Sequence, residues 1–206
     1  MGISIGYVDG PRLRRSLLAA AEWVGAGRDE LNRINVFPVP DGDTGTNFTL
    51  TMRSIAEALH RLRPDAPLPE VAHAAAEASV MGARGNSGIL LSHFVVGFRE
   101  VVGDRATMSA REVAAALRRG FQRLEEALTN PREGTILTVC RAAAEGAEAA
   151  AEEEKDLYHV VQRTLRDSEE ALQRTPELLA VLKHAGVVDA GGKGFVRVLE
   201  GVMRLI

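Results

Sequence analysis

Apolar residues recur along most of this chain at the spacing of an α-helix. The first such stripe comprises Leu13, Leu17, Leu18, Ala21 and Val24. Asp9 is placed to cap this helix, with Pro11 in its first turn, and Gly25 or Gly27 can end it. Further stripes predict helices over about 29–34, 46–62, 69–81, 89–101, 109–128, 135–154, 156–173 and 176–184, with a last helix after residue 194 that runs to Ile206.

Local signals mark the ends of several of these helices. Ser109 and Glu112 have the spacing of a capping box, and the pair Thr175 and Pro176 predicts the start of a short helix. The sequence contains no convincing strand, because the run 35–39 carries too much proline for one. About eight or nine helices with no internal repeat predict an all-α fold. We expect residues 1–206 to form one domain, a bundle or barrel of antiparallel helices.

Composition excludes several classes of protein. The chain has 206 residues, 46% of them hydrophobic and 26% charged, and its formal net charge is −3. This balance argues against binding of nucleic acid by bulk charge. One cysteine excludes an internal disulfide, and no apolar run approaches the roughly 20 residues of a membrane span. We therefore expect a cytoplasmic protein with no secretory signal.

Three irregular, glycine-containing segments interrupt the helical pattern at residues 35–47, 82–88 and 186–194, and each precedes a predicted helix. A helix N-terminus offers unpaired N–H groups and a partial positive charge. Glycines before it let the backbone approach a phosphate closely. None of the three segments matches the P-loop pattern, so any phosphate binding here differs from that of P-loop and Rossmann proteins.

The segment 41–47 carries the strongest chemical signal. Asp41 and Asp43 lie on either side of Gly42, so their carboxylates can converge on one centre. Mg²⁺ prefers oxygen ligands and is often held by one or two carboxylates together with substrate phosphates. The following residues add hydroxyl, amide and N–H groups: Thr44, Gly45, Thr46 and Asn47. The alternative is that both aspartates are ordinary turn and cap residues.

The other candidate segments are weaker when each is taken alone. In the second, Asn86 and Ser87 with their N–H groups can grip phosphate, and Arg84 can add charge. The third, around Asp189, can close over the base or ribose of a nucleotide, or help to hold phosphate. Gly134 and Thr135 begin a further predicted helix. The alternative in each case is structural: a glycine-rich turn or a helix cap.

Together the three segments resemble those of a known family. The run 35–47, Asn-Val-Phe-Pro-Val-Pro-Asp-Gly-Asp-Thr-Gly-Thr-Asn, looks like the signature of the nucleotide-binding domain of bacterial fatty acid kinase. That domain is related to the L-type, ADP-binding subunit of dihydroxyacetone kinase. The runs 82–92 and 188–194 match the family's other two segments in the same order, so the likeness covers nearly the whole chain.

The resemblance implies a barrel of eight antiparallel helices that binds ATP or ADP and two Mg²⁺ ions at one end. Asp41 and Asp43 correspond to two metal-binding aspartates of the family. Asn35 is the nearest counterpart of a third, and either ligates metal or braces the loop. The implied nucleotide contacts are Thr44, Gly45, Thr46, Asn47, Gly82, Arg84, Asn86, Ser87, Gly88, Gly134, Thr135, Asp189, Ala190 and Gly191.

The resemblance also implies a reaction, which is transfer of the γ-phosphate of ATP to an acceptor held by a partner protein. The fatty acid branch, which forms an acyl phosphate, is our first hypothesis, because the Asn-Val-Phe-Pro-Val-Pro lead-in is typical of it. A dihydroxyacetone kinase subunit and a non-catalytic nucleotide-binding regulator are the alternatives. Expected partners are a substrate-carrier protein, further domains of the same kinase and a second copy of the chain.

Overall fold

The computed structural model describes residues 5–153 and 156–205. Within them it contains helices and one isolated bridge, between Val8 and Met108, but no strand. The helices are α1 (Gly10–Ala26), α2 (Arg28–Arg33), α3 (Thr44–Arg61), α4 (Leu68–Met81), α5 (Gly85–Val102), α6 (Ala110–Glu126), α7 (Ile136–Glu153), α8 (Leu157–Leu178), α9 (Ala180–Ala185) and α10 (Ala190–Met203). In this part of the chain, none of them is both long and apolar enough to cross a membrane.

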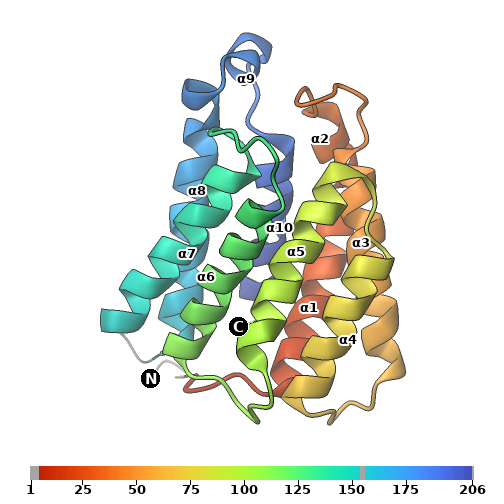
Figure 1. Cartoon of the computed structure of the whole chain (residues 1–206), viewed down its shortest axis with the longest axis vertical. Coiled ribbons are helices and arrows are strands. Elements are labelled where there is room, and N and C mark those ends of the chain that lie inside the picture. Colours follow the sequence, from red (N-terminus) through yellow and green to blue (C-terminus); the bar gives the residue numbers. More distant parts are fainter. Residues whose placement is uncertain (1–4, 154–155, 206) are drawn as a thin grey trace.

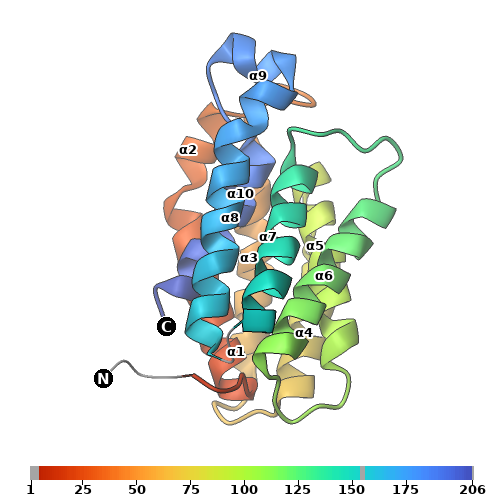
Figure 2. The ribbon, with the colours of Figure 1, turned by 90° about the vertical axis from the view of Figure 1, so that its left-hand side faces the viewer.

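Eight of these helices form a closed ring, which confirms the predicted all-α barrel (Figure 1). Around the ring each helix packs on the next in the order α3, α4, α5, α6, α7, α8, α10 and α1, and α1 packs on α3. Neighbours run in opposite directions, as Figures 1 and 2 show. The short helices α2 and α9 lie together with the α6–α7 loop at one end of the barrel.

Several predicted helix ends are confirmed by their hydrogen bonds. The Asp9 carboxylate accepts a hydrogen bond from the Arg12 N–H at 2.9 Å, and α1 ends at Gly27. The Glu112 carboxylate accepts from both the N–H and the hydroxyl of Ser109, at 2.8 and 2.9 Å. The ends predicted at Glu154 and Ile206 lie outside the described residues.

Three helices begin earlier than predicted. Helix α3 starts at Thr44, α5 at Gly85 and α10 at Ala190, so much of each glycine segment belongs to the first turn of a helix. Glycine disfavours a helix by only about 1 kcal/mol relative to alanine, and close packing outweighs this. A Cβ at Gly88 would lie 2.4 Å from Thr51 Oγ1, so glycine lets α5 approach α3.

The predicted short helix that starts at Thr175 and Pro176 is wrong. Helix α8 continues to Leu178 with Pro176 inside it, and α9 is a separate helix. Proline has no N–H, so it leaves the carbonyl of Leu172, four residues earlier, without its usual helical partner. The Thr175 hydroxyl donates to that carbonyl at 2.7 Å instead. This bond compensates for the missing N–H and lets the helix pass through the proline.

The tight packing of Gly97 of α5 against α6 gives a testable prediction about stability. A Cβ at Gly97 would lie 2.5 Å from the Arg119 carbonyl oxygen, whereas one at Gly25, in α1, would be 3.8 Å from its nearest neighbour. We expect Gly97→Ala to lower the free energy of unfolding by about 1–3 kcal/mol. Gly25→Ala is the matched control and should raise it by up to about 1 kcal/mol. Urea denaturation measures both, and equal stabilisation in the two variants would contradict the close contact.

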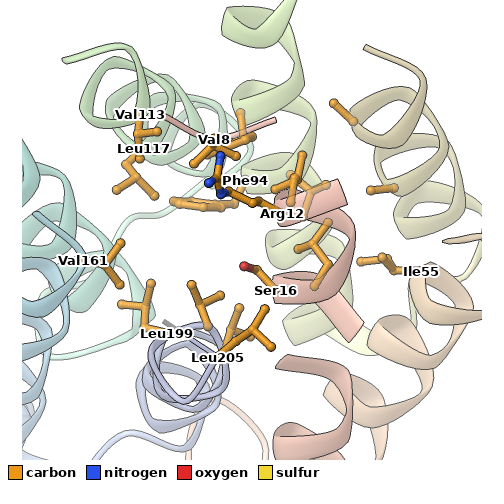
Figure 3. Close-up of a pocket in the computed structure, with 18 of the residues that line it drawn as sticks. Val8, Arg12, Ser16, Ile55, Phe94, Val113, Leu117, Val161, Leu199 and Leu205 are labelled. Atoms are coloured by element: carbon orange, nitrogen blue, oxygen red, sulfur yellow. The ribbon is translucent and has the colours of Figure 1, made fainter. Parts of the chain in front are cut away.

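A cavity of about 460 Å³ lies inside the barrel, toward the end opposite α2 and α9 (Figure 3). Seven helices line it, and Phe94, Val113, Val161 and Leu199 are among the side chains that point into it (Figure 3), while Arg12 is one of its few charged residues. The three glycine segments take no part in its wall. Because its lining is almost entirely apolar, this cavity is not the candidate phosphate site.

Candidate functional site

Alternate helices of the barrel place their N-termini at one end. Because neighbouring helices are antiparallel, α3, α5, α7 and α10 all begin at the end where α2 and α9 lie (Figure 1). A helix N-terminus has N–H groups without a partner inside the helix and about half a positive charge. The three glycine segments predicted from the sequence lie at this end, which therefore suits a ligand with several negative charges.

A second cavity, of about 350 Å³, lies at this end and brings the predicted segments together. Its wall includes one or more residues from each of the four predicted regions: Thr44, Asn86, Ser87, Thr135, Asp189 and Gly191. The other predicted site residues do not line it: Asn35, Asp41, Asp43, Gly45, Thr46, Asn47, Gly82, Arg84, Gly88, Gly134 and Ala190. They lie beside it in the chain, and several of them support its wall.

Sequence reasoning missed the rest of this wall. It comprises Phe37, Pro38, Ile89, Leu90, Ala127, Leu128, Thr129, Asn130, Arg132 and Ile136. The α6–α7 loop supplies many of these residues, none of which belongs to a segment predicted to carry the site. The exposed Arg132 lines the cavity, whereas Arg84 donates to its neighbour's carbonyl, Ala83 O, at 2.9 Å. Arg132 is therefore the cation at the wall.

The acidic loop holds two free carboxylates. Gly42 has φ +68°, a left-handed conformation that glycine adopts easily, and it separates Asp41 from Asp43. Asp41 is exposed and Asp43 half-buried. Asp43 is at the N-cap position of α3, yet its side chain makes no capping hydrogen bond. The alternative reading of Asp43 as a cap is therefore wrong. Among the described residues, neither carboxylate has a hydrogen-bond or ion-pair partner.

Two asparagines cap α3 in place of Asp43. The Asn35 Oδ1 accepts from the N–H groups of Asp43 and Thr44, at 3.2 and 3.1 Å, and from the Thr44 hydroxyl at 2.8 Å. The Asn32 Oδ1 accepts from the Thr46 N–H at 3.0 Å, and its Nδ2 donates to the Thr46 hydroxyl at 3.1 Å. These bonds satisfy the N–H groups of Asp43, Thr44 and Thr46 at the start of α3. The carboxylates of Asp41 and Asp43 are therefore not needed for capping and are available to a ligand.

Asn35 is a brace of the loop in this structure. Its Nδ2 donates to the carbonyl of Val39 at 3.0 Å, so both polar atoms of its side chain are used within the loop. Its role as a metal ligand stays a prediction. Asn32 was not predicted as a site residue. The only signal was its place in the last turn of the short helix, three residues before Asn35.

Helix α2, which carries Asn32, is tied to the barrel by an ion pair. Arg197 of α10 donates to the Glu30 carboxylate, and this hydrogen bond lowers the pKa of Glu30 below its ordinary value. Arg197 also lies over the ring of Trp23, 5.3 Å from its centroid. The position of Asn32 therefore depends on contacts between helices far apart in the sequence.

In the segment 82–88, the glycines pack against α3, whereas Asn86 and Ser87 lie toward the surface. Gly85 has φ +56°, and a Cβ there would lie 2.2 Å from the Asn47 amide nitrogen, so glycine is required at that contact. Gly82 is packed against Ser54 in a similar way. Asn86 is exposed and Ser87 half-buried in the first turn of α5, and in the described part of the chain their side chains make no hydrogen bond. They remain free to contact a ligand.

Asp189 is a buried carboxylate where α7 and α10 begin. It is 4% exposed and accepts from the Gly192 N–H at 2.7 Å, so the predicted capping role is present. Burial raises its pKa from 3.8 to about 6, although hydrogen bonds from the Gly192 and Ile136 N–H groups oppose this rise. Nearby, the Thr135 hydroxyl donates to the Arg132 carbonyl at 2.7 Å. The bond from Ile136 joins the segment around Asp189 to the start of α7 at the cavity.

Comparison with known sequences identifies the family. Residues 38–204, most of the chain, match the profile of the DAK2 domain. The chain is a member of the DAK2 domain family. This DAK2 domain is 42% identical over 201 residues to Protein YloV of Bacillus subtilis, and 38% identical over 202 residues to an uncharacterized protein of Staphylococcus saprophyticus. In both cases the match covers 98% of this chain but 36% of the relative. The chain thus spans about a third of the length of these relatives.

A solved structure shares the fold of this DAK2 domain. The dihydroxyacetone kinase of C. freundii, crystallised in complex with AMP-PNP and Mg²⁺, superposes with a TM-score of 0.72 at 20% sequence identity. The match covers 94% of this chain and 33% of that kinase. The superposition supports the assignment of the barrel, whereas the site rests on the geometry described above.

Proposed function

We propose that this DAK2 domain binds ATP with Mg²⁺ at the α2–α9 end of the barrel and is the ATP-binding part of a kinase. The main support for the proposal is that the predicted segments converge at one end of the barrel. Four helix N-termini and all of the predicted segments meet at one cavity, beside two carboxylates that have no partner among the described residues. Helix N-termini favour the binding of phosphate groups, and carboxylates favour the binding of a cation.

The residues present fit Mg²⁺ bound together with a nucleotide. In the described residues no group of three or more His, Cys, Asp or Glu side chains is arranged to hold a metal. A cation would therefore rest on Asp41 and Asp43 with further oxygens from the nucleotide phosphates, which is a common arrangement for Mg²⁺. The proposed two Mg²⁺ ions, when bound, would neutralise charge on the β- and γ-phosphates.

The chain's own residues would position the nucleotide. N–H groups in the first turn of α5, with the side chains of Asn86 and Ser87, would hold the phosphates. The apolar part of the wall, including Phe37 and Leu128, would take the base, and Asp189 with Gly191 would close the other side. The free thiol, Cys140, is fully buried, and burial raises its pKa, so it is not a nucleophile here. Positioning and charge stabilisation account for the proposed catalysis.

We propose a fatty acid as the acceptor, held by a carrier protein in the cytoplasm and converted to an acyl phosphate. An acyl carboxylate is already a nucleophile, so this chain needs no general base for that reaction. Further domains would complete the kinase, because the chain spans about a third of its relatives, and a second copy of the chain is a further proposed partner. Dihydroxyacetone on a binding subunit is the second candidate, favoured by the fold shared with the C. freundii kinase.

A phosphorylation assay separates these candidates. The chain is incubated with γ-labelled ATP and Mg²⁺ and is offered either a fatty acid on its carrier or dihydroxyacetone on its binding subunit, with carrier alone as the control. We expect label in the acyl phosphate. Label only in dihydroxyacetone phosphate would favour the second candidate. Tightly held nucleotide with no transfer to either acceptor would favour a nucleotide-binding regulator.

A further inference from the structure

The hydroxyl of Thr44 donates its hydrogen to Asn35, and no described residue donates a hydrogen bond to its lone pairs. The Asn35 Oδ1 accepts from two backbone N–H groups, which can only donate, so this atom is the amide oxygen and not the nitrogen. The Thr44 hydroxyl, 2.8 Å from the same oxygen, must therefore donate its hydrogen to it. What remains on Thr44 Oγ1 are lone pairs, which can accept a hydrogen bond or bind a cation.

Thr44 is also in the right place for a ligand. It follows Asp43 directly, is 5% exposed, and lines the 350 Å³ cavity. The hydroxyl of Thr46, two residues later, differs both in its hydrogen bonding and in its position relative to the cavity. It accepts a hydrogen bond from Asn32 Nδ2 at 3.1 Å, and it does not line the cavity. One of these two similar residues is thus prepared to donate a lone pair into the site.

We propose that Thr44 Oγ1 is a third protein oxygen ligand of the cation, beside Asp41 and Asp43, and that Asn35 is the positioning residue that holds it there. This inference rests on the proposed function. A hydroxyl ligand has a physical precedent in P-loop proteins, where a Ser or Thr hydroxyl binds the Mg²⁺ of the nucleotide. The carboxylates of Asp41 and Asp43 already balance the charge of one Mg²⁺. Because the Thr44 hydroxyl is neutral, it adds a ligand without placing further negative charge beside the phosphates.

A change of metal preference tests this assignment. Thr44→Cys replaces a hard oxygen by sulfur, whose thiolate prefers soft metals such as Cd²⁺. ADP is the probe, and its affinity is measured by calorimetry with Mg²⁺ or Cd²⁺. We expect Mg²⁺-supported binding to weaken by about 10–100-fold, the range seen for perturbed metal sites, and Cd²⁺ to restore it to within about threefold of wild type. Thr46→Cys is the matched control and should show no such switch. The native Cys140 is buried, so it should not compete for Cd²⁺.

A second pair of variants keeps the test independent of how well the cysteine variant folds. Thr44→Ser retains the hydroxyl and should keep the Mg²⁺ concentration for half-maximal ADP binding within about threefold of wild type. Thr44→Ala should raise this concentration about tenfold or more. Thermal unfolding of each variant checks that the loop change does not unfold the barrel.

The outcomes separate this inference from the proposed function. If the wild-type chain binds no ADP in the presence of Mg²⁺, the proposed function falls and the ligand assignment falls with it. If the wild type binds but Thr44→Cys keeps its Mg²⁺ dependence, only the ligand assignment is overturned. Loss of binding that Cd²⁺ does not restore, or an equal switch in Thr46→Cys, would show a structural role for Thr44 and would also overturn it.

Discussion

Replacing Asp41 or Asp43 by alanine is expected to weaken Mg²⁺-dependent ATP binding by about 100-fold or more. Perturbing residues around metal ligands already costs 10–100-fold in affinity, and these carboxylates are the proposed ligands themselves. Stability should change little, by less than about 0.5 kcal/mol, because neither side chain has a partner in the described part of the chain whose loss would cost stability. Calorimetric titration with ATP, with and without Mg²⁺, measures the affinity, and urea denaturation measures the stability.

Asp65→Ala is the matched control for this experiment. Asp65 is a well-exposed aspartate in the α3–α4 loop, at the far end of the barrel, and its ion pair with Arg63 is long, at 3.9 Å. Its removal should leave ATP binding unchanged. Unaltered affinity and unaltered metal dependence in both Asp41→Ala and Asp43→Ala would contradict the metal assignment. A large loss of stability in either variant would instead show that the loop depends on these carboxylates.

Asp189→Asn is expected to remove a strong pH dependence of stability. The pKa of Asp189 is about 6 in the fold against 3.8 ordinarily, so the native state binds the proton more tightly than the unfolded state does. This contribution to stability is fully present below about pH 4 and is lost as the pH rises through about 6. The loss amounts to roughly 3 kcal/mol, because each pH unit of difference is worth about 1.36 kcal/mol.

Asparagine has the same shape and cannot ionise, so the variant should escape this loss. Urea denaturation of both proteins at pH 4, 5, 6 and 7 measures the difference. We expect the variant to gain stability relative to wild type across this range, by up to about 3 kcal/mol. If the free energy of unfolding of wild type and of Asp189→Asn changed in parallel with pH, the raised pKa of Asp189 would be refuted. A buried charge that lowers stability at neutral pH is typical of functional sites, which fits the place of Asp189 at the cavity.

The prediction from sequence was most accurate where local signals act alone. Apolar periodicity and capping patterns located most of the barrel helices, because a helix must bury its apolar stripe and satisfy its end groups whatever surrounds it. It failed at Pro176, where the hydroxyl of Thr175, three residues before the end of α8, replaces the missing N–H. It also placed Gly85 and Ala190 in loops, because the contacts that favour a helix there come from other elements.

By itself the sequence determined the all-α class, the family and the segments that carry the candidate chemistry, because these depend on residue types and their spacing along the chain. Only the tertiary structure decided how those segments meet. It placed Asp189 in a buried setting, brought Arg132 to the cavity wall in place of Arg84, and gave the capping of α3 to Asn32 and Asn35. The physical reason is that burial, charge interaction and hydrogen bonding depend on which residues are neighbours in space, and a barrel makes neighbours of segments more than 100 residues apart.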